Sequence, residues 1–328
     1  MAQLTSNTTA FIESQQYSQF ILDNLHDYLL PEGMYRDVTD FGSGTTLNIK
    51  TVGTVTLQDA AEDTPLNFTN IDTGTITLAI TDYIGDAWKV SDDLREDGSQ
   101  VDTLMAMRAM ESTRALGENH ETRFLAVANA GQTAANLNLV NARPHRFVGS
   151  AAGNARTITL ADFVAMKLSF DKANAPAGGR IAIVDPIVEA TLNTLISATT
   201  VVNNTPQFQG VLNEGFARDH RFVRNIMGWD IYTSNFLPSL TAAEAINATS
   251  VGLTNETAAI GDKANVFMCV ADDSCKPVMH AWRRAPQTEG WRAEEERGDK
   301  YQVTSRFGFG VQRLDTLGVI LTDDTIYV

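Results

Sequence analysis

The sequence predicts an α+β protein, and three observations carry this prediction. A Thr-rich segment near the N-terminus alternates like a long β-hairpin, a long capped helix follows it, and the rest of the chain alternates helices with short apolar strands. The 328 residues are enough for about two domains and a sizeable core. The hydrophobic fraction of 43% is typical of a globular chain rather than a disordered one.

The first segment, residues 1 to about 35, begins with polar residues and then has a short helical pattern. Phe20 and Leu25 are among the apolar residues that recur near helical spacing, and Pro31 with Gly33 ends the pattern. Such a segment has little to bury itself against alone. We therefore expect an arm that lies on another surface, with Phe20 and Leu25 among its contacts.

Residues 45–57 and 75–81 have the pattern of two strands, because apolar and polar side chains alternate at most positions. An acidic tip with turn-forming residues lies between them and includes Asp59, Glu62 and Asp63. A two-stranded ribbon is only marginally stable in water, so a further surface must cover it. The alternative is an ordinary hairpin on the sheet of its own domain.

A long helix is predicted from Ser99 to about Gly131. Ser99 and Asp102 form a capping box at its start, and Gly131 is a typical C-terminal stop. About 30 residues would give a length of about 45 Å, well beyond the usual helix. Charged residues at three- or four-residue spacing cover a broad face, so we expect a strut at the surface. Its basic residues include Arg108, Arg114 and Arg123.

From about residue 156 the pattern changes to short helices and strands. Thr159 and Asp162 form a second capping box, residues 180–184 are a buried strand, and Asp185-Pro186 starts another helix. Further strands are expected near 229–234, 265–271 and 278–283. The chain closes with two strand-like runs, 301–313 and 317–327, which we expect to be broken by Gly308, Gly310 and Gly318.

The net charge of the chain argues against a nucleic-acid-binding protein. The net charge is −15, from 40 acidic and 25 basic residues, whereas phosphate binding requires an excess of Lys and Arg. No basic stripe or recognition helix is present, so we expect the isolated chain to bind DNA weakly or not at all. No apolar run approaches the ~20 residues that cross a bilayer, and we expect no membrane association.

Motifs of catalytic, cofactor or metal sites are absent, and we expect none of these sites. The five histidines are scattered, and His120-Glu121 is no zinc-protease motif because position 124 is Phe. Cys269 and Cys275 are expected to be reduced packing residues. Adjacent acids could bind a cation but more often form turns; the pairs are Asp92-Asp93, Asp272-Asp273 and Asp323-Asp324.

The order of these segments resembles the major capsid protein of tailed bacteriophages, with its lambdoid-type capsid fold. Three strings are similar to segments of that family: Arg180–Pro186 followed by a helix, Gly228–Pro238 and Arg306–Arg313. The resemblance covers nearly the whole chain and depends on the order of the parts, since no string is specific alone. It implies an N-terminal arm, an extended loop, a peripheral domain with a spine helix, an axial domain, and return strands that complete the peripheral domain. Their expected boundaries are 1–38, 39–92, 93–155, 156–288 and 289–328.

The resemblance implies a structural protein of the virion and no enzyme. Copies would self-assemble as hexamers and pentamers into an icosahedral shell that encloses double-stranded phage DNA without reading its sequence. Assembly would take place in the host cytoplasm. A separate scaffolding protein and a portal are the implied partners, and a decoration protein is a further candidate.

Contacts between subunits are expected at the arm, the extended loop and the strut helix. The acidic tip should meet arginines of a neighbour. Some family members form a Lys–Asn crosslink, but no Asn and Glu can be matched to Lys50. The inter-subunit candidates are Phe20, Leu25, Lys50, Asp59, Glu62, Asp63, Arg108, Arg114 and Arg123.

Two other functions fit the composition. One is the shell of a bacterial encapsulin-like nanocompartment, which would hold enzymes instead of DNA, and a cargo-tagged enzyme encoded nearby would favour it. The other is a soluble α+β hydrolase or carbohydrate-binding protein. A monomeric native mass would favour that alternative, and a megadalton particle would exclude it.

Overall fold

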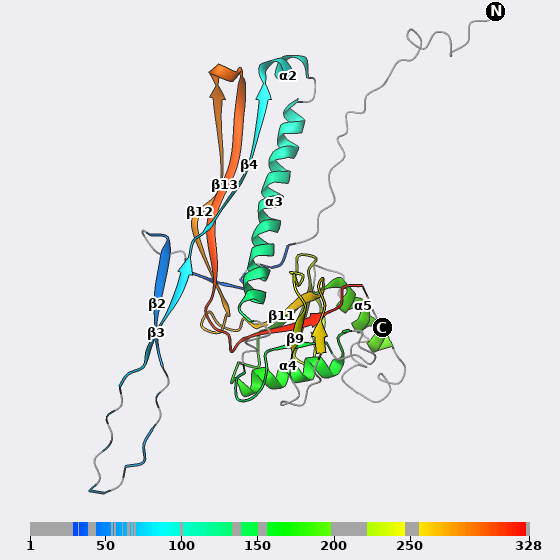
Figure 1. Ribbon diagram of the computed structural model, residues 1–328. Helices are drawn as coiled ribbons and strands as arrows, with labels where there is room; N and C mark the ends of the chain where they lie inside the picture. The colour runs from blue at the N-terminus through cyan, green and yellow to red at the C-terminus, as the bar shows by residue number, and fades with distance from the viewer. Residues whose placement is uncertain are drawn as a thin grey trace, which may run out of the picture.

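The computed structural model describes residues 29–31, 33–38, 44–53, 55, 57–60, 62–63, 66, 68, 70–98, 101–132, 139–149, 156–197, 222–246 and 256–325. This part of the chain has three regions (Figure 1). A tower of long strands stands beside one long helix, a compact region surrounds a six-stranded sheet, and a hairpin projects away from both. The α+β class is confirmed.

The tower is a four-stranded sheet with the order β1-β12-β13-β4. Neighbouring strands are antiparallel except that β1 pairs with β12 in parallel. The strands are β1 (Arg36–Asp37), β4 (Asp82–Ser91), β12 (Val278–Ala293) and β13 (Gly298–Val311), and the 3₁₀ turn Glu294–Glu296 links β12 to β13. Two segments far apart in the sequence, β4 and the β12–β13 hairpin, thus form one sheet.

The long predicted helix is confirmed as α3 (Val101–Ala130), although Ser99 of its expected capping box lies outside the described residues. It runs along the tower (Figure 1) and buries Leu116, Phe124 and Leu125. The short helix α2 (Asp92–Asp97) precedes it.

The compact region contains a six-stranded sheet with the order β5-β14-β11-β6-β8-β7. Every residue of β6 is buried, because helices and the tower cover both faces. The strands are β5 (Arg146–Val148), β6 (Arg180–Val184), β7 (Phe222–Ile226), β8 (Trp229–Thr233), β11 (Lys263–Cys269) and β14 (Leu317–Thr322). The small pair β9 (Glu244–Ile246) and β10 (Glu256–Ala258) lies beside this sheet.

The two helices of the compact region begin where the sequence predicts. In α4 (Leu160–Lys172) both hydrogen bonds of the Thr159–Asp162 capping box are present. Pro186 is the first residue of α5 (Pro186–Ser197), and the Ile187 N–H donates to the Asp185 carboxylate. One core of the sheet contains the aromatic side chains of Phe163, Phe170, Trp229 and Phe267. The other core joins the sheet to α3 and the tower.

Three expectations about strands are wrong. The strand near 278–283 extends to Ala293, because β13 pairs with it along nearly its whole length. Gly308 and Gly310 do not break β13, and Gly318 lies within β14. A Cβ at Gly308 would collide with the Ala79 carbonyl oxygen, so this glycine permits a close approach of two backbones. The first hairpin strand ends at Val52 and not at residue 57.

Candidate functional site

The hairpin is formed by β2 (Thr46–Val52) and β3 (Thr73–Ala79), which are antiparallel. The ladder runs from Thr46 opposite Ala79 to Val52 opposite Thr73. Beyond it, the Gly53 N–H donates to the Asp72 carbonyl at 2.9 Å and closes the ladder. The predicted hairpin is therefore confirmed, and residues 54–71 lie beyond its last pair.

Burial along the hairpin changes abruptly from base to tip. At the base, Leu78 is 0% exposed and Ile80 2% exposed, and both pack against Met279 and Ala281 of β12. Beyond the ladder the large apolar side chains face solvent. They are Val55, Leu57, Leu66, Phe68 and Ile71, at 52–103% exposure. The subunit therefore anchors one end of the hairpin and leaves the other uncovered.

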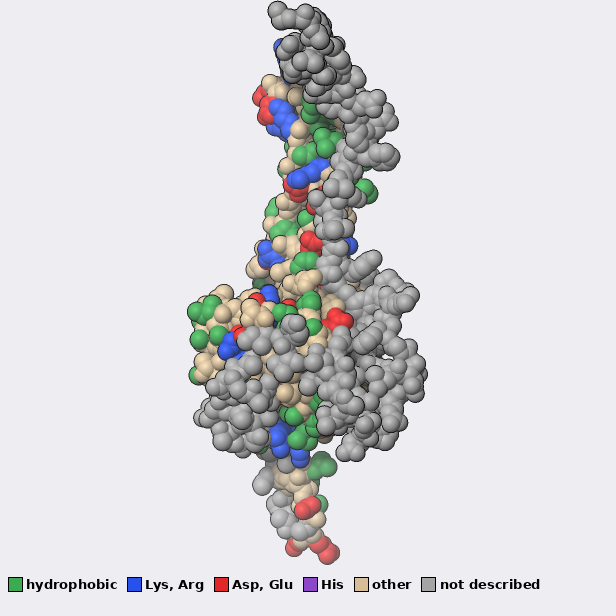
Figure 2. All heavy atoms as spheres, turned by 90° about the vertical axis from the view of Figure 1, so that its right-hand side faces the viewer, with side chains coloured by type: hydrophobic (Ala, Val, Ile, Leu, Met, Phe, Trp, Pro, Cys, Tyr) green, Lys and Arg blue, Asp and Glu red, His purple; other side chains and the backbone are tan. Residues whose placement is uncertain are grey.

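The acidic side chains of the tip are also exposed. Asp59, Glu62 and Asp63 face solvent, and Figure 2 shows acidic side chains gathered at the lower end of the molecule, which is the hairpin tip. Lys50 lies in β2 as expected, and its ammonium group donates to the Thr75 hydroxyl at 3.1 Å. The tip therefore combines negative charge with apolar surface.

The three predicted arginines of α3 have partners within their own subunit. Arg108 bonds both carboxylate oxygens of Asp86 at 2.8 Å, and Arg123 bonds Asp82 at 2.6 Å. Both acids belong to β4, so these two arginines fix the helix to the tower. Arg114 pairs with Glu118 one turn later, at 3.4 Å. Any contact of these arginines with a neighbouring copy would have to compete with, or add to, these pairs.

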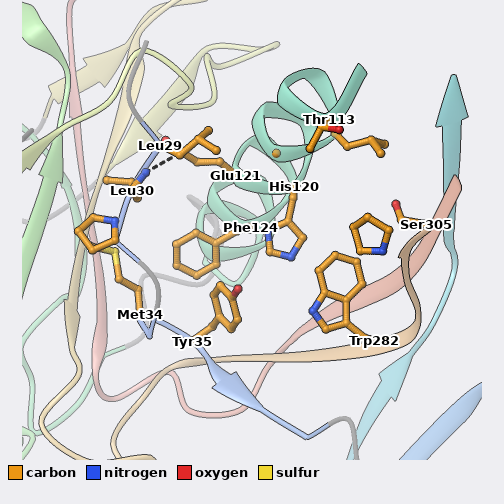
Figure 3. A pocket seen from close by; sticks show the side chains of 14 residues that line it. Leu29, Leu30, Met34, Tyr35, Thr113, His120, Glu121, Phe124, Trp282 and Ser305 are labelled. Carbon is orange, nitrogen blue, oxygen red and sulfur yellow. Dashed lines mark hydrogen bonds between the residues drawn. The ribbon is translucent and has the colours of Figure 1, made fainter. Parts of the chain in front are cut away.

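A cavity of about 340 Å³ lies between α3, β12, β13 and the segment that precedes β1. Figure 3 shows aromatic rings from three elements around it: Tyr35 before β1, His120 and Phe124 on α3, and Trp282 on β12. Thr113 and Leu29 lie at the end where a second hollow begins, and this hollow also contains Met110 and Arg114. The lining is therefore mainly apolar, with a few polar groups.

The segment before β1 is held to α3 beside this cavity. The Leu30 N–H donates to the Glu121 carboxylate at 2.8 Å (Figure 3), and the Ser234 hydroxyl donates to its other oxygen at 2.7 Å. Glu121 is buried and joins the arm segment, α3 and the compact region. Leu29 reaches the helix at Gly117, where a Cβ would lie 2.7 Å from the leucine methyl. Phe20 and Leu25, the predicted arm contacts, lie outside the described residues.

Two histidines that looked scattered in the sequence meet under the cavity. The Nε2 atoms of His120 and His280 are 3.2 Å apart, and both rings contact Tyr35 and Trp282. Burial lowers the pKa of each from 6.5 to about 4, so both are neutral near pH 7. For His120 the neighbouring His280 lowers the pKa further, while Asp37 partly offsets the shift of His280. In the sequence, the only indication that His120 is buried was its place one turn before Phe124, on the same face of the helix.

The described residues contain no cluster of three or more His, Cys, Asp or Glu side chains that could hold a metal ion. Cys269 and Cys275 are both free thiols, as expected, and Cys269 is buried. No helix within the described ranges is long and apolar enough to cross a membrane. The candidate functional features are therefore the uncovered hairpin tip and the cavity against α3.

Comparison with known proteins gives a consistent result. A family model described as phage capsid protein matches residues 45–322. Among solved structures, the capsid of cyanophage P-SCSP1u is 18% identical with a TM-score of 0.68, over 96% of this chain and 94% of that chain. The mature capsid of bacteriophage PhiM1 is 12% identical with a TM-score of 0.69, over 99% and 98%. The capsid of a native GTA particle is 12% identical with a TM-score of 0.60, over 98% and 99%. No curated protein matches.

The subunit combines a tower of long strands, a compact region that shares one core with this tower, and a projecting hairpin with an uncovered tip. The family match covers most of the chain, and the solved structures share its fold from end to end. The chain belongs to the phage capsid protein family. It is a major capsid protein, a structural component of the virion shell and not an enzyme.

Proposed function

We propose that this chain forms the icosahedral head of a tailed bacteriophage, arranged as hexamers and pentamers around double-stranded DNA. The uncovered distal half of the hairpin is the observation that supports this most directly. Five large apolar side chains beyond the ladder are at least half exposed. Leaving them in water is unfavourable, and a closed symmetric assembly buries the same surface in every copy.

The parts of the fold are proposed to have the roles that the family resemblance implies. Residues 1–38 are the arm, 39–92 the extended loop, 93–155 the peripheral domain with α3 as its spine, 156–288 the axial domain and 289–328 the return strands. One refinement follows from the pairing of β4 with β13. Because β4 is a strand of the tower, the extended loop functionally ends at about residue 81.

The proposed partners are a separate scaffolding protein, a portal and, as a further candidate, a decoration protein. DNA is enclosed without being recognised by sequence. The excess of 15 acidic over basic residues supports this, because tight binding requires several phosphates to be neutralised. The nanocompartment and hydrolase alternatives find no support in the family match, which is to a phage capsid protein.

Deletion of Thr54–Ile71 tests the proposed role of the hairpin. Gly53 and Asp72 are the last hydrogen-bonded pair of the hairpin, so a two-residue Asn-Gly linker joins them in place of residues 54–71. Asn-Gly turns close an antiparallel hairpin at a hydrogen-bonded pair and match the twist of the flanking strands. We expect a folded subunit, because the base of the hairpin and both cores are intact, but no closed shells by electron microscopy.

A matched control replaces residues 54–71 with a Gly/Ser segment of the same length. This variant keeps the loop length and removes the apolar and acidic side chains, so it should also fail to close shells. Intact particles of normal size from the deletion variant would contradict the proposal.

A further inference from the structure

We propose that residues 17–28, which lie outside the described part of the chain, form an amphipathic helix that packs in parallel along α3 of its own subunit. The inference names the surface that receives the arm and the register of the contact. It goes beyond the proposed function, because it concerns the single subunit and does not require a shell.

A seam along α3 has the spacing and the exposure to receive such a helix. Residues separated alternately by four and three positions share one face of a helix. The seam has this spacing and consists of Ala106, Met110, Thr113 and Gly117. Ala106 and Thr113 are exposed, and Met110 is 60% exposed. The hollow beside Leu29 is lined by Met110 and Thr113 of the seam. This face of α3 therefore presents small side chains and one large apolar side chain that the rest of the described chain leaves uncovered.

The described end of the arm already occupies the last position of the seam. Leu29 lies on Gly117, where an added Cβ would come within 2.7 Å of the leucine methyl group. A glycine inside a helix is destabilising relative to alanine, so a packing reason is expected at this position. The close approach of Leu29 supplies that reason.

Two contacts fix the direction of the arm relative to α3. Leu29 lies at Gly117, and the Leu30 N–H donates to Glu121, which is one turn later on the helix (Figure 3). The arm and α3 therefore run in the same direction at this point. A continuation of this course brings the residues before Leu29 to Thr113 and then to Met110.

The sequence before Leu29 has the same spacing as the seam. Four residues of the arm are separated by four, three and four positions; they are Ser18, Leu22, Leu25 and Leu29. In a parallel pair of helices, the layer of Leu29 on Gly117 is followed by a layer of Leu25 on Thr113. The next layer places Leu22 on Met110. An isolated helix of this length is marginal in water, so burial of these leucines on α3 is what stabilises it.

The opposite face of this helix is polar apart from one residue. Phe20, Asp23 and Asp27 share that face, because they are separated by three and four positions. Leu25 is then a contact within the subunit and not the inter-subunit contact that the sequence led us to expect. Phe20 points away from α3 and stays available to a neighbouring copy.

Cysteine pairing in purified particles tests the proposal. The variant carries Leu25→Cys and Thr113→Cys with Cys275→Ser, while the buried Cys269 stays. A disulfide requires Cα atoms within about 4.4–6.8 Å, which residues of one layer between two closely packed helices can provide. We expect an intrachain bond, seen on a non-reducing gel as a monomer band of altered mobility that a reductant removes. Covalent dimers instead would place the arm on α3 of a second copy and overturn the proposal.

The matched control carries Asp23→Cys in place of Leu25→Cys. Position 23 is only two residues away, but it lies on the opposite face of the proposed helix, so the shifted band should be lost. A flexible arm would bring both positions to Thr113 equally often. Equal bond formation through positions 23 and 25, or none through position 25, overturns the proposal.

If the cysteine variant does not fold or assemble, oxidation of Met110 decides. Dissociated wild-type subunits and a variant without residues 1–28 are treated with hydrogen peroxide, and the sulfoxide at Met110 is followed by mass spectrometry. Met227, in the compact region, is the internal reference. An arm that is seated about 90% of the time should slow the oxidation of Met110 about tenfold relative to the truncated variant.

Two substitutions separate the faces of the arm in the same measurement. Leu25→Asp should abolish the protection of Met110, and Phe20→Asp should leave it unchanged. Equal rates for the full-length and truncated chains overturn the proposal. Protection that appears only in assembled particles also overturns it, because a neighbouring copy then covers the seam. Neither result affects the proposed shell function, which the Thr54–Ile71 deletion tests separately.

Discussion

The six-stranded sheet and the hairpin use the same kinds of side chain in opposite ways. In the compact region Phe267 is fully buried among Phe163 and Trp229. In the hairpin Phe68 is fully exposed. The apolar residues of the sheet therefore hold the subunit together, whereas those of the distal hairpin are proposed to become buried only against another copy. On this proposal, folding and assembly depend on different regions of one chain.

The largest effect on subunit stability is expected from Phe267→Ala. Removal of a buried phenyl ring costs the transfer free energy and leaves a cavity, together about 3–5 kcal/mol. The matched change Phe68→Ala should alter the unfolding free energy by less than about 0.5 kcal/mol, as for an exposed position. Urea unfolding of the isolated subunit measures both. A comparable loss of unfolding free energy from the two changes would contradict this difference between the two regions.

Acid should weaken the join between the arm segment and the tower. The folded pKa of His120 and of His280 is about 4, below the ordinary value of 6.5. Between pH 4 and 6.5 the unfolded chain therefore binds more protons than the folded chain. The contribution of the two histidines to the free energy of unfolding is complete above pH 6.5 and is lost as the pH falls towards 4. The expected loss is on the order of 1–3 kcal/mol.

Thermal unfolding of His120→Phe and of the wild type between pH 7 and 4 separates this contribution from that of the carboxylates. The variant lacks one of the two imidazoles, so its stability should fall less steeply over this interval. Parallel curves for the two proteins would argue that the histidine pair is not responsible.

The smallest effect is expected at the acidic tip. Reversal of Asp59, Glu62 and Asp63 to Lys should leave the free subunit unchanged and lower particle yield, most clearly at low salt. Exposed ion pairs contribute only about 0–1 kcal/mol each and are screened by salt, although every copy repeats them. The corresponding amides should give intermediate yields. A particle yield that does not depend on ionic strength would show that the tip charges do not contribute to assembly.

Local signals in the sequence predicted the elements that local chemistry controls. The Thr159–Asp162 capping box, the helix that starts at Pro186 and the alternation around Ile49 all correspond to observed elements. Their hydrogen bonds or burial patterns are set by residues within a few positions. This is why the starts of the two helices could be read directly, although the strand around Ile49 was predicted to continue to residue 57 and ends at Val52.

Long-range pairing could not be predicted in the same way. The strand β4 was missed because its partner β13 lies more than 200 residues later, and because Asp82 and Asp86 interrupt the apolar side chains on its less exposed face. Without β4, the partners of Arg108 and Arg123 could not be identified, since Asp86 and Asp82 belong to it. The His120–His280 contact was missed for the same reason. It depends on how the tower packs on α3, not on sequence spacing.

The hydrogen bond between Gly53 and Asp72 has a consequence for how such chains diversify. The ladder is closed there, so whatever is inserted beyond it changes the entropy of loop closure but not the strands. Each doubling of a flexible loop costs only about 0.6 kcal/mol. The reach of the hairpin can therefore lengthen or shorten between related chains with little effect on the folded tower, and the span between neighbouring subunits can evolve separately from the subunit itself.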